Sequence, residues 1–279
     1  MASDLATQRR FFAEEIQAIG NHRTAALVDA LATVPREAFL AAGPWTIRAE
    51  GDVGEPRRHT PDADPRRVYH NVSVAIDPAR MLFNGADRLG LGPGDAVLHV
   101  GTGAGYYTAL IAHVVGYRGR VTGIEVDHGL AEAARANLPA FAQVAVRQGD
   151  GVDGVGPESC DAILVNAGVT HPHPAWVAAL KPGGRLVLPL TFTPPQMGPI
   201  GKGALVLLTR PTDGGDFGAR VIGMVAIYSA VGIRDAALDE RLQDAYRRGA
   251  WPAFTRLRRD PHDTSSTCWQ HGDGFCLSA

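Results

Sequence analysis

The middle of the chain, from about residue 82 to residue 190, alternates short apolar runs with segments of helical periodicity. In order, these predict helix, strand, glycine-rich loop, helix, strand, helix, strand, loop, strand, helix and strand. Such alternation with short connections is typical of parallel strands joined by right-handed crossover helices. The pattern therefore predicts an α/β fold with a doubly wound, mostly parallel sheet.

Two amphipathic segments precede this region. Residues 5–20 place apolar side chains on one side, and residues 22–33 continue after a possible cap at Asn21, so both predict helices. Together they would form an N-terminal helical cap, which either contributes to a substrate site or only covers the sheet edge. The stretch 43–78 is rich in Pro, Gly, Arg and Asp and predicts a long loop, with a short β element at 68–77.

After the core, apolar runs at 204–209 and 219–227 predict a hairpin that finishes the sheet antiparallel. Leu238 and Leu242 mark a last amphipathic helix, and the tail from Ser265 onward contains enough large side chains to be packed. We therefore divide the chain into three parts. These are the helical cap and substrate-side loop (1–80), the cofactor-binding core (81–232), and a C-terminal helix and tail packed on the core (233–279).

The stretch 96–106, A-V-L-H-V-G-T-G-A-G-Y, reads as a strand that ends in a glycine loop before a helix. Glycines allow a ligand to approach the backbone, and the start of the helix offers free N–H donors. The dinucleotide fingerprint requires a small residue where Tyr106 stands, and no phosphate-binding P-loop motif occurs. A nucleoside is therefore a better ligand than a dinucleotide, and an oxidoreductase is the least favoured enzyme class.

Polar residues follow the next three strands. Glu125 lies 20 residues after Gly105, where a carboxylate can accept hydrogen bonds from both ribose hydroxyls. Asp150 suits an adenine amino group or a helix N-cap, and Asn166 either lines the site or belongs to a simple turn. The candidate cofactor residues are Gly101, Thr102, Gly103, Gly105, Tyr106, Glu125, Val126, Asp150, Gly151 and Asn166.

Five motifs carry a resemblance to a known family. They are V-L-H-V-G-T-G-A-G-Y-Y (97–107), I-E-V-D (124–127), Q-G-D-G (148–151), L-K-P-G-G-R-L-V-L-P (180–189) and V-P-R-E-A-F (34–39). Together they resemble the S-adenosylmethionine-dependent methyltransferases and, among these, the protein-L-isoaspartate O-methyltransferases. The resemblance implies S-adenosyl-L-methionine as cofactor, S-adenosyl-L-homocysteine as product, and O-methylation of a carboxyl group. A carboxylate is already ionised at neutral pH, so this chemistry needs no general base.

The chain departs from the family before the glycine loop, where family members carry a T-[IV]-S-Q-P-like stretch that holds the substrate carboxylate. Here the comparable residues are Ala75-Ile-Asp-Pro-Ala79 or, in another register, Asn71-Val-Ser-Val74. If Asp77 replaces the serine, its like charge would weaken binding of the carboxylate and change the substrate choice. Asp77 and Asn166 are the candidate catalytic residues.

Composition adds few constraints on function. A net charge of -2 over 279 residues gives no reason to expect nucleic acid, and no segment predicts a signal peptide or a membrane span. The three cysteines suit a reduced, cytoplasmic protein, and Cys268-x7-Cys276 is a poor spacing for a metal. His171 and His173 could form a pair of metal ligands, but exposed loop histidines seldom bind a metal. We expect no metal site.

The sequence leaves other functions open. One alternative is an RNA or small-molecule methyltransferase of the same fold, which a basic patch with stacking aromatic residues would favour. Another is a non-catalytic regulatory protein that binds the cofactor and has a blocked acceptor channel. The expected partner is a peptide or small-molecule methyl acceptor, and the chain is expected to be a monomer or homodimer.

Overall fold

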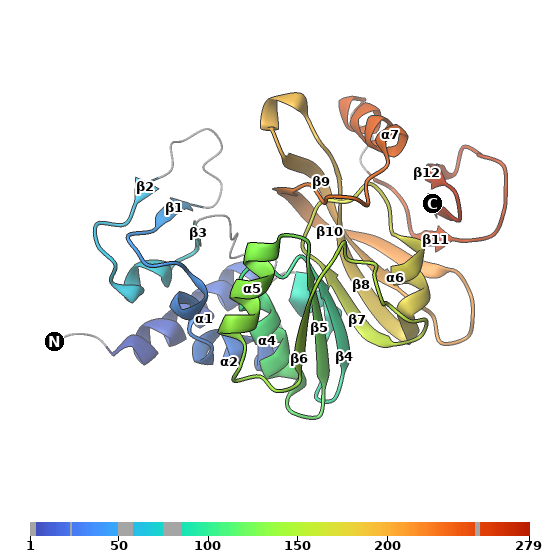
Figure 1. Ribbon diagram of the computed structural model, residues 1–279. Coiled ribbons are helices and arrows are strands. Elements are labelled where there is room, and N and C mark those ends of the chain that lie inside the picture. The colour runs from blue at the N-terminus through green and yellow to red at the C-terminus, as the bar shows by residue number, and fades with distance from the viewer. Residues whose placement is uncertain (1–3, 23, 50–57, 75–84, 249–251) are drawn as a thin grey trace.

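A ten-stranded sheet forms the centre of the molecule, and the N-terminal helices and the C-terminal hairpin lie at opposite sides of it (Figure 1). The computed structural model describes residues 4–22, 24–49, 58–74, 85–248 and 252–279. The strand order is β12-β13-β11-β10-β9-β8-β7-β4-β5-β6. None of the described helices combines the length and apolar character needed to cross a bilayer.

The parallel part of this sheet has the predicted doubly wound arrangement. Its strands are β4 (Ala96–Val100), β5 (Arg120–Glu125), β6 (Val144–Gln148), β7 (Cys160–Val165) and β8 (Leu180–Phe192). The helices between them are α4 (Tyr106–Val115), α5 (His128–Asn137) and α6 (Pro174–Ala179). β4 pairs with β5 on one side and β7 on the other, so the strand order reverses direction at β4. Ligands bind at such switch points, outside the carboxyl ends of the strands.

Alternating strand residues supply two separate cores, one on each face of the sheet. Val97 and its same-face neighbours belong to a core that also contains residues of α4 and of the N-terminal helices α1 (Leu5–Gly20) and α2 (Ala25–Thr33), with α2 packed on α4. Leu98 faces the opposite way, where it joins the core that contains Trp176 of α6. The apolar runs are continuous because both faces are buried.

The antiparallel part of the sheet is larger than the sequence pattern predicted. β9 (Ile200–Thr209) and β10 (Phe217–Tyr228) form the predicted hairpin. The expectation that this hairpin finishes the sheet is wrong, because β11 (Arg256–Arg258), β13 (Phe275–Ser278) and β12 (Cys268–Gly272) continue it beyond β10. The added strands pair with N–H and C=O groups that would otherwise stay open along the edge of β10. The predicted last helix is α7 (Ala236–Arg247), which buries Leu238 and Leu242.

The N-terminal part contains both predicted helices and a small sheet that the pattern did not predict. β1 (Thr46–Ala49) lies between β2 (Arg58–His59) and β3 (Val72–Val74). Only β3 falls in the predicted β element at 68–77, because β1 and β2 are too short to show alternation within the Pro- and Arg-rich stretch. The division of the chain into three parts stays a prediction.

Arg36 of the V-P-R motif joins the helical cap to this small sheet. Its side chain is fully buried, and its guanidinium donates to the carbonyl oxygens of Val68 at 2.9 Å and Val72 at 3.2 Å. Its backbone N–H donates to the hydroxyl of Tyr69 at 3.0 Å. A buried cation with several hydrogen bonds fixes the position of the segment around it.

Candidate functional site

The glycine loop turns sharply between β4 and α4. Gly101, Gly103 and Gly105 have φ values of 78°, 53° and 100°, a region that side chains rarely adopt. The Gly101 N–H donates to the carbonyl oxygen of Ile124 at 2.8 Å, and the Gly105 N–H donates to that of Thr102 at 3.0 Å. The loop is therefore held against the end of β5 and leads directly into the first turn of α4.

The three glycines differ in what a side chain would meet. A Cβ on Gly101 would lie 3.1 Å from the carbonyl oxygen of Asn166, and one on Gly105 would lie 2.9 Å from Leu138 Cδ1. A Cβ on Gly103 would have no atom within 4 Å and would project into open space. Gly101 and Gly105 thus serve the packing of the loop, whereas Gly103 leaves room for a ligand.

Replacing Gly103 by valine is expected to weaken binding of S-adenosyl-L-homocysteine about tenfold or more, because the side chain would enter the open space above the loop. The left-handed backbone should cost only about 1–3 kcal/mol of unfolding free energy. Calorimetric binding and urea unfolding measure the two effects. Valine at Gly116, which also has a positive φ but lies outside the cavity, is the control and should keep full affinity.

Glu125 ends β5 beside the glycine loop and is only 7% exposed. Its Oε2 accepts a hydrogen bond from the Gly103 N–H at 2.8 Å, and its Oε1 accepts one from the Asp127 N–H at 3.1 Å. These two bonds fix the direction of the carboxylate. A carboxylate has about four acceptor positions, so each oxygen retains capacity for a further donor. This arrangement suits two neighbouring hydroxyls.

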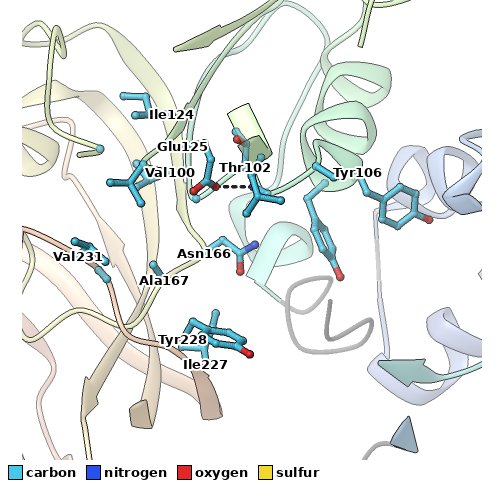
Figure 2. Close-up of a pocket in the computed structure, with 18 of the residues that line it drawn as sticks. Val100, Thr102, Tyr106, Ile124, Glu125, Asn166, Ala167, Ile227, Tyr228 and Val231 are labelled. Carbon is cyan, nitrogen blue, oxygen red and sulfur yellow. Dashed lines mark hydrogen bonds between the residues drawn. The ribbon is translucent and has the colours of Figure 1, made fainter. Parts of the chain in front are cut away.

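The ends of β6 and β7 complete this side of the site. Asp150 Oδ1 accepts from the Val152 N–H at 3.1 Å in a local turn, and no helix follows it in the described chain before α6, so the helix-cap alternative is wrong. The Asn166 N–H donates to the carbonyl oxygen of Val100 at 2.7 Å. Figure 2 shows the Asn166 amide between Glu125 and Tyr228, at the centre of the site.

A cavity of about 630 Å³ lies over these strand ends. Nine of the ten candidate cofactor residues line it, and the exception is Gly105, the last glycine of the loop. Of the other walls, the N-terminal one was an open alternative for the helical cap and substrate-side loop (1–80), and the one at the end of β10 was not predicted. These walls come from the N-terminal part (Arg36, Phe39, Leu40, Ala41 and Val74) and from the end of β10 and the residues after it (Ile227, Tyr228, Ser229, Ala230, Val231 and Ile233). The candidate Asp77 lies outside the described residues.

Tyr106, at the position that a dinucleotide loop keeps small, is buried as the first residue of α4 and lines the cavity. Its ring centroid lies 5.6 Å from that of Phe39 in the V-P-R-E-A-F motif. The large side chain therefore connects the glycine loop to the helical cap. The sequence analysis did not predict this contact.

His99 lies within β4 and is fully buried. Its Nδ1 lies 2.9 Å from Thr108 Oγ1, within hydrogen-bond distance, while Nε2 has no hydrogen-bond partner among the described residues. Burial lowers the pKa of His99 to about 3, so the imidazole is neutral in the folded protein. The structure thus places His99 in the core.

This pKa shift predicts a loss of stability in acid. The unfolded chain gains a proton on His99 near pH 6.5, and the folded chain does so only near pH 3. The contribution of neutral His99 to the unfolding free energy is therefore fully present above pH 6.5, and about 2 kcal/mol of it is lost by pH 5. In His99→Gln, the fall in unfolding free energy between pH 7 and pH 5 should shrink by about this amount. An equal fall in the variant and the wild type, measured by urea unfolding, would contradict the assignment.

His171 and His173 have structural roles among the described residues. The His171 ring stacks on Phe275 with centroids 5.6 Å apart, and His173 Nδ1 accepts from the Ala175 N–H at 3.2 Å at the start of α6. Burial lowers the pKa of both side chains. Among the described residues, neither histidine belongs to a group of side chains that could hold a metal ion; such a group lies elsewhere, near the C-terminal strands, and is described below.

Comparison with known families identifies the class of this site. The model of the family described as protein-L-isoaspartate(D-aspartate) O-methyltransferase matches residues 7–198, more than half of the chain. The chain belongs to this family. The protein-L-isoaspartate O-methyltransferase of Methylorubrum extorquens is 38% identical over 221 residues, which cover 76% of this chain and 85% of the relative. That of Methanopyrus kandleri is 33% identical over 186 residues, 65% of this chain and 76% of the relative.

Solved structures share the fold. A structure named protein-L-isoaspartate O-methyltransferase has a TM-score of 0.60 at 21% identity and covers 86% of this chain and 69% of its own. A Plasmodium falciparum structure described as a putative member, in complex with S-adenosyl-L-homocysteine, has a TM-score of 0.57 at 16% identity. It covers 80% of this chain and 97% of its own. The doubly wound methyltransferase fold expected from the sequence is confirmed.

As a member of the protein-L-isoaspartate O-methyltransferase family, the chain is a methyltransferase that uses S-adenosyl-L-methionine. The site fits this cofactor, because a buried carboxylate at Glu125 faces open space above Gly103 within one cavity. When bound, the cofactor supplies a methyl group on a positively charged sulfur. The protein then has to hold the acceptor in line with it and exclude water.

Proposed function

We propose that this protein methylates a free carboxylate of a peptide, with the α-carboxylate of an L-isoaspartyl residue as the preferred acceptor. This carboxylate is free because the peptide bond of an isoaspartyl residue runs through its side-chain carboxyl. The observation that carries the proposal is the single cavity that connects the glycine loop and Glu125 to the V-P-R-E-A-F segment and the end of β10. One half has the groups that a nucleoside requires. The other half is formed by segments that do not belong to the parallel strands or the loops that follow them, and an acceptor can enter there.

We propose the following roles around the cavity. Glu125 and the glycine loop hold the nucleoside, and Asp150 with Gly151 contacts the adenine. Asn166 lies between the two halves, where its amide can donate to a carboxylate and orient it. The largely apolar walls, including Val74, Val231 and Ile233, keep water away from the methyl group.

The charge on the acceptor side supports a carboxylate. Arg36 lines the cavity from the helical cap, and its guanidinium is held in place by the carbonyl oxygens of Val68 and Val72. A fixed positive charge at this wall makes the electrostatic potential favourable for an incoming anion. A carboxylate acceptor is the nucleophile in its ordinary ionised form, so the site requires no side chain that removes a proton.

The experiment is a transfer assay with S-adenosyl-L-methionine labelled in the methyl group. An L-isoaspartyl peptide is compared with the same peptide carrying L-aspartate. We expect label only in the isoaspartyl peptide and its release as methanol in mild base, which distinguishes a carboxyl methyl ester from an N-methyl product. Cofactor binding without transfer to either peptide would overturn the proposed acceptor, as would a base-stable product.

Asp77→Ser tests the departure from the family motif, independently of the structure. If Asp77 opposes the acceptor carboxylate, the variant should lower the KM for the isoaspartyl peptide and leave cofactor affinity unchanged. An unchanged KM would exclude this role for Asp77. The cytoplasmic location and the monomeric or homodimeric state stay predictions from the sequence.

A further inference from the structure

Four potential metal ligands meet in the C-terminal extension, outside the segment that the family model matches. Cys268 and His271 lie on β12, Cys276 lies on β13 directly opposite His271, and His262 lies in the connection before β12. One ligand atom from each side chain lies within 4.8 Å of all the others. The Cys268 Sγ and His262 Nε2 atoms are 3.6 Å apart.

This set of side chains matches the chemistry of zinc. Two thiolates and two imidazoles in a closed tetrahedron are a common structural Zn²⁺ site. Zinc–ligand distances of about 2.0–2.3 Å place neighbouring ligand atoms roughly 3.3–3.8 Å apart in such a tetrahedron. The observed separations therefore require only small side-chain rotations to reach the geometry of a bound ion. Four protein ligands leave no open position for a reacting group.

The surroundings orient these ligands. His262 Nδ1 lies 2.8 Å from the carbonyl oxygen of Asp260, so this nitrogen carries the proton and the lone pair of Nε2 is directed toward Cys268. The Ser265 N–H donates to Cys268 Sγ at 3.3 Å. Such outer contacts are typical of metal sites, because they fix the histidine tautomer and stabilise the thiolate.

A second, independent observation is a buried polar atom without a partner. His271 Nδ1 is buried and makes no hydrogen bond among the described residues. Both cysteines are free rather than paired in a disulfide. A disulfide between them would leave the convergence of His262 and His271 unexplained, whereas a metal ion accounts for all four side chains.

We propose that His262, Cys268, His271 and Cys276 bind one Zn²⁺ ion. This ion ties the connection around His262 to the β12–β13 hairpin and stabilises the outer edge of the sheet. The proposal does not depend on the methyl acceptor. It replaces the expectation of no metal site, which rested on the spacing of the two cysteines along the sequence.

The site also supports the loop after β7, which begins at the candidate Asn166. Gln270, between two of the ligands, donates through Nε2 to the carbonyl oxygen of Thr170 at 2.8 Å. Phe275, next to Cys276, stacks on His171 of the same loop. The metal site therefore holds the strands that pack against one wall of the cofactor cavity.

Metal analysis of the purified full-length chain tests the proposal. We expect one zinc per chain in the wild type and in the control Cys160→Ala, and almost none in Cys268→Ser and Cys276→Ser. Cobalt exchanged into the reduced wild type should give the intense visible bands of a tetrahedral ion together with thiolate charge-transfer bands. These readouts do not require enzyme activity.

A measurement on the wild type alone keeps the test decisive if the serine variants fail to fold. A thiol-modifying reagent should release one zinc per chain, detected with a coloured chelator. Zinc absent from the wild type together with no tetrahedral cobalt spectrum would overturn the proposal. A Cys268–Cys276 disulfide in the freshly purified protein, found by peptide mapping, would also overturn it.

Discussion

Replacing Glu125 by alanine is expected to weaken binding of S-adenosyl-L-methionine and S-adenosyl-L-homocysteine by roughly 100-fold. In its proposed role, Glu125 accepts two charge-assisted hydrogen bonds from ribose hydroxyls, and the variant would lose both, each contributing about 1.5 kcal/mol or more. The Gly103 N–H would also lose its acceptor at 2.8 Å, so the glycine loop would be held less firmly. Isothermal titration calorimetry measures the change directly.

Two further variants show whether the charge at Glu125 matters. Glu125→Gln keeps the size and one acceptor oxygen, so we expect an intermediate loss of affinity. Glu132→Ala is the control, since Glu132 is exposed on α5 and pairs with Arg135 away from the cavity. An unchanged dissociation constant in Glu125→Ala would show that the nucleoside binds elsewhere.

Replacing Trp176 by alanine is expected to cost about 3–5 kcal/mol of unfolding free energy. Trp176 is completely buried in the core on the α6 face of the sheet. Its Nε1–H donates to the carbonyl oxygen of Gly151 at 2.8 Å, so the variant would also remove support from the end of β6. Urea unfolding followed by circular dichroism measures the loss.

The controls for Trp176 separate volume from hydrogen bonding. Trp176→Phe keeps most of the buried surface and should cost about 1–2 kcal/mol, largely because the Gly151 carbonyl loses its donor. Tyr117→Ala removes an aromatic ring that is 82% exposed and should change the unfolding free energy by no more than about 0.5 kcal/mol. Equal losses in Trp176→Ala and Tyr117→Ala would contradict the assigned core.

The parallel core could be predicted from the sequence because its signals are local. Each strand is a continuous apolar run, and each crossover helix has its own periodicity and turn residues. The small N-terminal sheet could not be predicted, since β2 has only two residues and β1 pairs with β3 on the far side of the Pro- and Arg-rich stretch. The continuation of the large sheet through β11 and β13 depends likewise on long-range pairing.

The candidate site likewise has one part that could be predicted from the sequence and one part that could not. Gly103, Glu125, Asp150 and Asn166 follow strand ends, so the parallel fold alone brings them together. The wall from Tyr228 to Ile233 contains no recognisable sequence motif. It reaches the cavity because β10 ends beside the loop after β7. There the Gly168 N–H donates to the carbonyl oxygen of Tyr228 at 2.7 Å.

The possible zinc ligands were missed because two of them face each other across a hairpin. The spacing of Cys268 and Cys276 along the sequence is uninformative until His271 and Cys276 are placed in register and His262 folds back onto them. The sequence pattern does not show that the segment around His262 folds back onto this hairpin.

The measurement that tests the central claim most directly is calorimetric titration of the wild type with S-adenosyl-L-homocysteine, with NAD in parallel. We expect one S-adenosyl-L-homocysteine to bind per chain, and we expect this binding to be lost or strongly weakened in Glu125→Ala. We expect no binding of NAD, because Tyr106 occupies the position that a dinucleotide loop keeps small. Absence of binding by S-adenosyl-L-homocysteine and by S-adenosyl-L-methionine, in a chain that unfolds cooperatively, would contradict the assignment of this cavity as the cofactor site.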